Sequence, residues 1–287
     1  MAFAQLSKVR LEYFAHGEGP ERVLLIHGFQ ASAAIWRLVQ AALPADRYTS
    51  IAINNRGAGG SEAPPREEDF SVQIFAADAF ELVTELGWRD FTLVGHSLGG
   101  ATVAQFAVDH PDLIKGLVLL DPSDPDGRQL PQEGPTLDDV IERAMSARRA
   151  QQAAGAAGDG IDAAALRGPS SEVARAVATD MRNAPEQRLR GSMRSMFQLR
   201  IGERVKDLPM PVLMAAGDID ELIPISAMLA TWAKFPTGSG LHVWHGVGHS
   251  PNLDAPGDVA ALLRRFVETT IPARTARRAA PVAADPG

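Results

Sequence analysis

Short apolar runs recur along the chain and alternate with stretches in which apolar residues come every three or four positions. The short runs lack polar alternation, which is typical of parallel strands covered on both faces. Six strands are predicted, at residues 22–28, 48–54, 91–96, 114–121, 211–218 and 241–246. Residues 71–87 and 98–109 have the pattern of helices. This alternation predicts an α/β fold in which helices cover both faces of a parallel sheet.

The N-terminal segment has a different pattern. Apolar and polar positions alternate around the turn residues 17–20 within the segment 8–26. Such alternation on both sides of a glycine-containing turn favours an antiparallel hairpin at the edge of the sheet.

The alternation of strand and helix stops between residues 123 and 202. Helices are predicted here at 136–153, 171–183 and 186–201, with a flexible Gly/Ala-rich linker at 153–162. Because the strand pattern resumes at 211, we interpret residues 123–202 as a helical insertion into one core formed by 1–122 and 203–271. Residues 272–287 are rich in Pro, Ala and Arg, and we expect a disordered tail.

Composition excludes several classes of protein. Of the 287 residues, 45% are apolar and 22% are charged, as in globular proteins with a large core. A net charge of −7 provides no basic surface for nucleic acid or an anionic membrane. The chain has no cysteine, which excludes thiolate catalysis and cysteine-bound metals. No transmembrane run or secretory signal is recognised, so a cytoplasmic location is expected.

The segment 91–100, FTLVGHSLGG, places a serine between glycines where a predicted strand meets a predicted helix. Gly95, Ser97 and Gly99 match G-x-S-x-G, the nucleophile elbow. In so tight a turn the serine adopts a strained conformation, and side chains at the two glycines would collide with the neighbouring strand and helix. The motif predicts that the Ser97 hydroxyl projects from the carboxyl edge of the sheet.

A serine nucleophile needs a histidine base that a carboxylate orients. His249 follows the last predicted strand in a loop that can turn back over the sheet, whereas His245 belongs to the strand end and is interpreted as structural. Asp220 follows the preceding strand and is predicted to be the acid. Asp218, directly after a glycine, is expected to bond the backbone of the turn.

A second loop could also supply the carboxylate. Asp121 and Asp124 come after the strand that ends at Leu120, and either is the alternative to Asp220. Asp220 is favoured because it lies three residues after Gly217 and four before Pro224.

Two backbone amides are needed to hold an oxyanion. One is predicted to come from Leu98, at the start of the helix that follows the serine. The other is predicted to come from Phe29, because the chain turns after His27 and Gly28 at the end of the first buried strand. We interpret His27 as a residue that holds this loop; the alternative is that it simply ends the strand.

Five segments together resemble the α/β-hydrolase superfamily. They are HGF at 27–29, NNRGAGGS at 54–61, GHSLGG at 95–100, GDIDELIP at 217–224 and GHSPNLDAP at 248–256. The likeness is greatest to small capped members: esterases, enol-lactonases, cofactor-free haloperoxidases and C–C bond hydrolases. It implies a mostly parallel, doubly wound sheet with a helical cap inserted after the sixth strand, at 123–202. The order Ser97, Asp220, His249 is the order of triad residues in this fold.

One departure and one choice of residue refine the resemblance. Asn54 stands where the family usually has Asp, at a position that is generally structural. Serine at residue 97 argues against the haloalkane dehalogenase and epoxide hydrolase chemistry of the same superfamily. No metal-binding or nucleotide-binding motif occurs, so no cofactor and no metal are expected.

These residues favour a serine hydrolase that cleaves a carboxylic ester or lactone through an acyl-enzyme. The alternatives with the same triad are C–C bond hydrolysis of a diketone-like ring-fission product, amide hydrolysis and perhydrolysis. A further alternative is a non-catalytic ligand receptor on the same fold. The expected partner is a small, at least partly apolar, ester-like molecule. The sequence determines neither the substrate nor the oligomeric state.

The predicted cap offers two sets of residues that could recognise substrate. The first set could line an apolar pocket, although docking of the cap helices on the core is favoured: Met145, Met181, Met193, Met196 and Phe197. The second set could bind a substrate carboxylate, although solvated helix faces are favoured: Arg148, Arg149, Arg190, Arg194 and Arg200.

Overall fold

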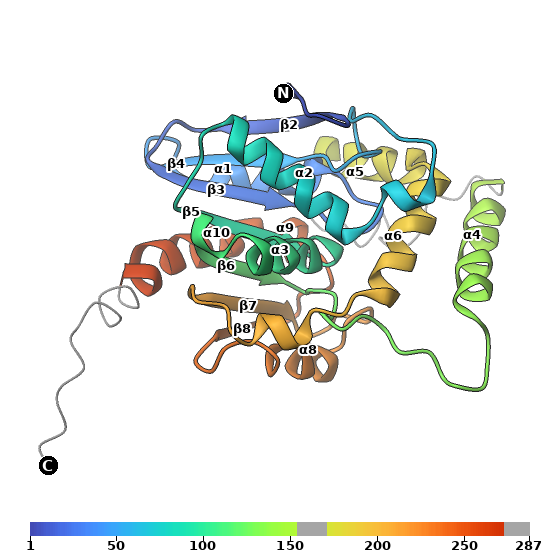
Figure 1. Ribbon diagram of the computed structural model, residues 1–287. Helices are drawn as coiled ribbons and strands as arrows, with labels where there is room; N and C mark the ends of the chain where they lie inside the picture. The colour runs from blue at the N-terminus through green and yellow to red at the C-terminus, as the bar shows by residue number, and fades with distance from the viewer. Residues whose placement is uncertain (154–170, 273–287) are drawn as a thin grey trace, which may run out of the picture.

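A mostly parallel sheet of eight strands runs through the centre of the protein in the computed structural model, which describes residues 1–153 and 171–272 (Figure 1). The strand order is β1-β2-β4-β3-β5-β6-β7-β8. The strands are β1 (Ala2–Gln5), β2 (Arg10–His16), β3 (Glu21–Ile26), β4 (Tyr48–Ile53), β5 (Phe91–His96), β6 (Ile114–Leu120), β7 (Val212–Gly217) and β8 (Gly240–Trp244). All pairings from β4 to β8 along this order are parallel.

Helices cover both faces of the sheet, as the apolar pattern predicts (Figure 1). Along β3, Leu24 and Ile26 belong to one apolar cluster, while Val23 and Leu25 belong to the other. The first cluster includes side chains of α2 (Val72–Glu85), α3 (Leu98–Asp109) and α8 (Ile225–Trp232). The second includes side chains of η1 (Ala33–Trp36), α1 (Arg37–Ala42), α9 (Pro251–Asp254), α10 (Pro256–Arg265) and η4 (Phe266–Thr270). Because both faces are buried, the strands need apolar residues at consecutive positions.

The predicted N-terminal hairpin is wrong. β2 pairs with β1 and with β4, antiparallel in both cases, and β4 separates it from β3. The reason lies in the turn: Gly17 has φ +76°, and a Cβ there would lie 2.1 Å from the Tyr48 carbonyl oxygen. The Glu18 amide donates to the Ala45 carbonyl oxygen at 2.8 Å. The turn therefore crosses over the start of β4 instead of closing a hairpin.

Between β6 and β7 the chain leaves the sheet and forms helices, the insertion that the sequence predicts (Figure 1). They are α4 (Leu137–Ala153), α5 (Ser171–Asn183), α6 (Glu186–Gln198) and α7 (Gly202–Val205). The short helices η2 (Glu67–Asp69) and η3 (Pro111–Leu113) complete the described elements. Most of the predicted linker and tail lies outside the described residues. No described helix has the length and apolar character needed to cross a membrane.

A small apolar cluster joins this helical segment to the core. Ile141 and Met145 of α4 pack with Leu189 of α6. The partly buried side chain of Phe29 contacts both this cluster and the main core. The loop that follows β3 is thus held between the sheet and the inserted helices.

A buried ion pair attaches the loop after β4 to α2. Arg56 donates from Nε and Nη2 to the two carboxylate oxygens of Asp78, at 2.7 and 2.6 Å, and the side chains are 4% and 8% exposed. Burial raises the pKa of Asp78 even with Arg56 beside it, so its charge is costly without that partner. We expect Arg56→Met to lower the free energy of unfolding by about 3–5 kcal/mol, measured in urea.

An exposed pair of the same type provides the control. Arg66 and Asp69 form a bidentate contact in which the arginine is 71% exposed. Arg66→Met should change the free energy of unfolding by less than about 1 kcal/mol. Similar losses in both variants would show that burial of the Arg56 pair has no special weight.

Candidate active site

Ser97 lies at the turn between β5 and α3 with φ +54° and ψ −118°, a conformation that residues with side chains rarely adopt. A Cβ at Gly95 would lie 2.1 Å from the Gly99 carbonyl oxygen. A Cβ at Gly99 would lie 2.3 Å from the Ile26 carbonyl oxygen. Only glycine fits at these two positions, as the elbow motif predicts, and the turn places Ser97 at the N-terminus of α3.

Two unpaired amides flank the serine. Leu98 is the first residue of α3, and Phe29 follows the end of β3. Within the described part of the chain, neither N–H group donates a hydrogen bond. The loop of Phe29 reaches the serine, since a Cβ at Gly28 would lie 3.0 Å from Ser97 Cβ. Both amides that the sequence predicts for an oxyanion hole are therefore available beside the elbow.

His27 holds the loop of Phe29 in place. Its Nε2 accepts a hydrogen bond from the Asn55 amide at 3.1 Å, so the proton is on Nδ1, which donates to the Gly28 carbonyl oxygen at 2.8 Å. Burial, and then the nearby Arg188 charge, lower the pKa of His27 to about 3. A neutral ring with both nitrogens bonded fits the structural role that the sequence predicts.

Asp220, which is buried, and His249, which is partly buried, form a hydrogen-bonded pair in the loops after β7 and β8. Asp220 Oδ2 lies 2.7 Å from His249 Nδ1, and the aspartate side chain is 0% exposed. Asp220 Oδ1 accepts from the amides of Leu222 and Ile223 at 2.7 and 3.0 Å. Burial opposes ionisation, but these bonds, that of His249 foremost, hold the pKa of Asp220 below its ordinary value. The pair has the form of a base oriented by a carboxylate.

Two close approaches hold the loop of His249 against the end of β7 and against His96, the residue before Ser97. A Cβ at Gly217 would lie 2.0 Å from the Val247 carbonyl oxygen, so the loop folds onto the end of β7. His96, which precedes Ser97, bonds the His249 carbonyl oxygen through Nε2 at 2.7 Å, and the two rings lie 5.0 Å apart. No hydrogen bond joins the Ser97 hydroxyl to the His249 ring among the described residues. Such bonds often tighten only when substrate binds.

The other candidate acids have different partners. Asp218 bonds the exposed His245 ring and accepts from the Gly246 amide, both at 2.6 Å, so its partners lie in the loop after β8 and not in its own turn. Asp124 accepts from Lys234 Nζ at 2.6 Å. Asp121 is buried beside Asp220, and burial raises its pKa to about 9. Asp220 and Asp121, which the sequence offers as alternative acids, thus lie together at the same site. The sequence did not indicate this proximity.

Three of these residues have a spacing that a metal ion could use. Asp121, Asp220 and His249 each offer one atom within 4.8 Å of the others. Two tetrahedral ligands of one ion would be about 3.4 Å apart, because metal–ligand distances are about 2.1 Å. The 2.7 Å separation of Asp220 and His249 is that of a hydrogen bond. The geometry therefore fits a hydrogen-bonded network.

Asn54, where the family usually has Asp, has a structural role. Its Oδ1 accepts from the Ala33 amide and its Nδ2 donates to the Glu12 carboxylate, both at 2.6 Å. An aspartate could not donate to Glu12. The presence of Glu12 accounts for the amide at this position.

The methionines of the inserted segment and Phe197 mostly pack its helices. Met145 and Met181 are buried in apolar clusters, and Phe197 is also buried. Met193 and Met196 are partly buried against such clusters. These positions support the docking interpretation.

The five arginines named in the inserted segment form hydrogen bonds to other groups of the protein. Arg148 is buried and donates to carbonyl oxygens at the end of α5, so the prediction of a solvated face is wrong for it. Its long side chain closes the end of a helix whose carbonyls have no intrahelical partner. The others bond carboxylates or carbonyls: Arg149, Arg190, Arg194 and Arg200.

The sequence did not single out Arg188, which connects α6 to the site. It is 2% exposed and donates from Nη2 to the Ala31 carbonyl oxygen at 2.8 Å and from Nη1 to the Gly57 carbonyl oxygen at 3.4 Å. Burial lowers the pKa of Arg188 to about 10. Its bond to Ala31 fixes the loop two residues after Phe29. The sequence pattern did not indicate that Arg188 is buried, because arginines are frequent throughout the segment 123–202.

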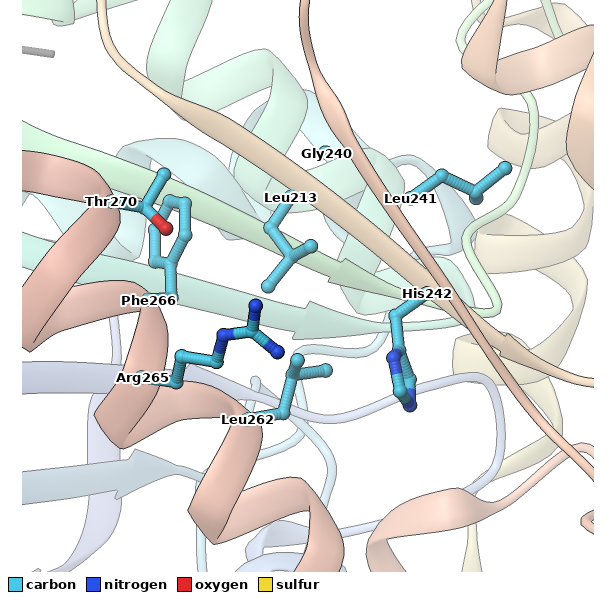
Figure 2. Close-up of a pocket in the computed structure, with 8 residues that line it drawn as sticks. All are labelled: Leu213, Gly240, Leu241, His242, Leu262, Arg265, Phe266 and Thr270. Atoms are coloured by element: carbon cyan, nitrogen blue, oxygen red, sulfur yellow. The ribbon is translucent and has the colours of Figure 1, made fainter.

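A groove of about 180 Å³ lies elsewhere, between β8 and α10 (Figure 2). Figure 2 shows Arg265 extending between Leu213 and Leu262. Its lining residues are Leu213, Gly240, Leu241, His242, Leu262, Arg265, Phe266 and Thr270. None of them is a predicted site residue.

Two buried histidines and Asp121 make stability depend on pH. Burial, and then the charge of His249, lower the pKa of His96 to about 3, as burial does for His27. Between pH 3 and 6.5 the unfolded chain therefore binds two protons that the folded chain does not. Stability from these rings is complete above pH 6.5 and is lost as pH falls, by about 1.4 kcal/mol per pH unit for each ring.

Asp121 acts in the opposite direction, because its raised pKa keeps it protonated in the folded chain. The loss from the two histidines is thus partly offset by Asp121. As pH falls from 6 to 4.5, we expect the three groups together to lower the free energy of unfolding by about 1.4 kcal/mol per pH unit. Urea titrations at four pH values measure this slope. Asp121→Asn should steepen it to about 2.8 kcal/mol per unit, and a flat profile in both proteins would refute the assignment.

Comparison with known proteins identifies the class to which this fold and site belong. Residues 21–256 match the model of the alpha/beta hydrolase fold family, so the chain belongs to that family and is an α/β-hydrolase. Among curated relatives, a fluoroacetate dehalogenase from Burkholderia sp is 42% identical over 108 residues, 37% of this chain and 35% of that protein. The match thus spans about a third of that relative. An uncharacterized protein of Mycobacterium bovis is 29% identical over 95% of this chain and 82% of its own length.

Solved structures show the same fold over nearly the whole chain. A bromoperoxidase from Bacillus anthracis has a TM-score of 0.78 and 24% identity, covering 93% of this chain and 99% of its own. A thermophilic esterase from Thermogutta terrifontis has a TM-score of 0.74 and 22% identity, covering 94% and 98%.

Proposed function

We propose that this protein hydrolyses a carboxylic ester or lactone, with Ser97 as nucleophile, His249 as base and Asp220 as the orienting acid. One observation carries the proposal: the strained Ser97 turn and the buried Asp220–His249 pair converge at the carboxyl edge of the sheet. They are linked through His96. This edge is where ligands bind in open α/β sheets.

The hydrogen bonds support a role for each atom in the proposed reaction. Because His249 Nδ1 faces Asp220, its Nε2 is the nitrogen free to take the proton of the Ser97 hydroxyl as that oxygen attacks the carbonyl. The unpaired amides of Phe29 and Leu98 would hold the oxyanion. His249 then protonates the leaving alcohol, and water that it activates releases the acid from the acyl-enzyme.

We propose that residues 123–202 act as a cap over this site on the core of 1–122 and 203–271. Two contacts support this role. Arg188 of α6 bonds the loop of Phe29, whose side chain packs against the inserted helices. A cap of this kind would select a small, partly apolar ester-like substrate.

The type of nucleophile favours ester or lactone hydrolysis over the reactions of some relatives. Dehalogenases and epoxide hydrolases are among the curated proteins that match. Serine in the elbow supports acyl transfer to its hydroxyl instead, because its oxygen can form an ester with the acyl group of the substrate.

A probe and a substrate panel test the proposal. A fluorophosphonate should label Ser97, located by mass spectrometry of the digested protein. p-Nitrophenyl esters of graded acyl length and a series of lactones should include at least one that is hydrolysed with a burst of product. Labelling of another residue would overturn the assignment of the nucleophile. Turnover of diketone or amide substrates alone would overturn the assignment of ester or lactone hydrolysis.

A further inference from the structure

Asp121 is fixed rigidly beside the proposed triad. It is the first residue after β6, has φ +41° and is 0% exposed. Its amide donates to the Ala215 carbonyl oxygen at 2.9 Å, and its Oδ1 accepts from the Gly217 amide at 3.2 Å. Two bonds to β7 therefore hold this carboxyl group at the start of the loop that carries Asp220.

The second oxygen of Asp121 has no ordinary donor. Oδ2 is buried, and no N–H or O–H group of the described residues donates to it. One oxygen of this carboxyl group lies within 4.8 Å of an oxygen of the Asp220 carboxylate. Two adjacent buried carboxyl groups cannot both carry a charge without a large cost, so they share a proton.

The position of that proton follows from the bonds of Asp220. Asp220 accepts three hydrogen bonds, from the Leu222 and Ile223 amides and from His249, all of which favour its charged form. Asp121 accepts one, from Gly217. The proton therefore belongs on Asp121, where it can be donated to Asp220. The raised pKa of Asp121, caused first by burial and then by the charge of Asp220, agrees with this assignment.

We infer that Asp121 is a neutral carboxylic acid that donates a hydrogen bond to Asp220 and so positions the Asp220–His249 pair. The inference rests on the proposed function, because it assigns Asp121 a role in the same reaction. The added bond fixes the orientation of a carboxylate whose other bonds come from one loop and one ring. It also stabilises the negative charge that Asp220 must keep while His249 becomes an imidazolium.

Two variants of Asp121 distinguish the effect of its donated hydrogen bond from the effects of its charge and of its side-chain packing. Asp121→Asn keeps a donor and an acceptor in the same shape, and we expect kcat within about threefold of the native value. Asp121→Leu keeps the volume without the donor, and we expect kcat to fall at least tenfold while KM changes less than twofold. Asp124→Asn, in the same loop but bonded to Lys234, is the matched control and should leave kcat unchanged.

The pH profile gives a readout that a purely structural role would not change. Above about pH 9 Asp121 should ionise and kcat of the native enzyme should fall, whereas Asp121→Asn should keep its activity to a higher pH. The ionisable groups that act on this carboxyl or on its partner are Asp220, Asp254, His249 and His96. All four are present in both proteins, so their effects cancel in the comparison.

The outcomes are distinct. Equal losses in Asp121→Asn and Asp121→Leu would show that a charged carboxylate is needed, and native activity in both would show that Asp121 has no role. Either result overturns the inference. If Asp121→Leu does not fold, as judged by circular dichroism and Tm, the alkaline profiles of the native and Asp121→Asn enzymes decide alone. Fluorophosphonate labelling of Ser97 in each variant tests the proposed function separately, so its failure is recognisable.

Discussion

Replacing Ser97 by alanine is expected to lower kcat for ester hydrolysis by about 10⁴–10⁶-fold. The strained turn holds no second hydroxyl where Ser97 lies, and the amides of Phe29 and Leu98 can stabilise only an oxyanion that a nucleophile has created. Alanine fits the same backbone position, so the loss should appear in kcat with little change in Tm. Initial rates with a p-nitrophenyl ester and a thermal unfolding curve measure both quantities.

Ser123→Ala is the control for this substitution. The Ser123 amide donates to the Ser97 carbonyl oxygen at 3.0 Å, and its hydroxyl contacts Met196. It is thus a neighbouring serine without a proposed catalytic role, and its loss should change kcat less than about threefold. Retention of most activity by Ser97→Ala would mean that another group is the nucleophile.

The second large effect is expected for Asp220→Asn, about 10⁴-fold in kcat. The asparagine amide would present a donor or a weak acceptor to His249 Nδ1, which favours the wrong tautomer and leaves Nε2 protonated. Asp220 Oδ1 also binds two amides of its own loop, so the loop should remain folded if the asparagine oxygen takes their place. Steady-state kinetics over pH 6–9 measure the loss.

Asp218→Asn provides a matched control within the same loop. Asp218 also bonds a histidine at 2.6 Å, but that residue, His245, has a side chain that is 99% exposed. We expect kcat to stay within about twofold, because a solvated pair contributes little. If Asp218→Asn lowers kcat as much as Asp220→Asn does, the Asp218–His245 pair is needed for catalysis and the proposed triad is refuted.

Much of the fold follows from local patterns in the chain. The continuous apolar runs predict the five strands from β3 to β7 because each is covered on both faces. They also predict β8, although it lies at the edge of the sheet and leaves Leu241 and Val243 exposed. The glycines around Ser97 predict a turn that no larger residue can enter, and the structure places the Gly99 carbonyl 2.1 Å from a Cβ at Gly95. The same local logic predicted that Asp220 and His249 lie in the loops after adjacent strands, where they form a hydrogen bond.

What the sequence by itself determined, then, is the α/β-hydrolase fold and the residues at each strand end, because both depend on neighbours along the chain. Only the tertiary structure decided which distant groups share one environment. The crossing of the turn after β2 depends on the backbone at Tyr48, and the burial of Arg188 depends on the carbonyl of Ala31. The sequence offered Asp121 and Asp220 as alternatives. The structure places one oxygen of each within 4.8 Å of the other, because β6 and β7 are adjacent and their loops leave the same edge of the sheet.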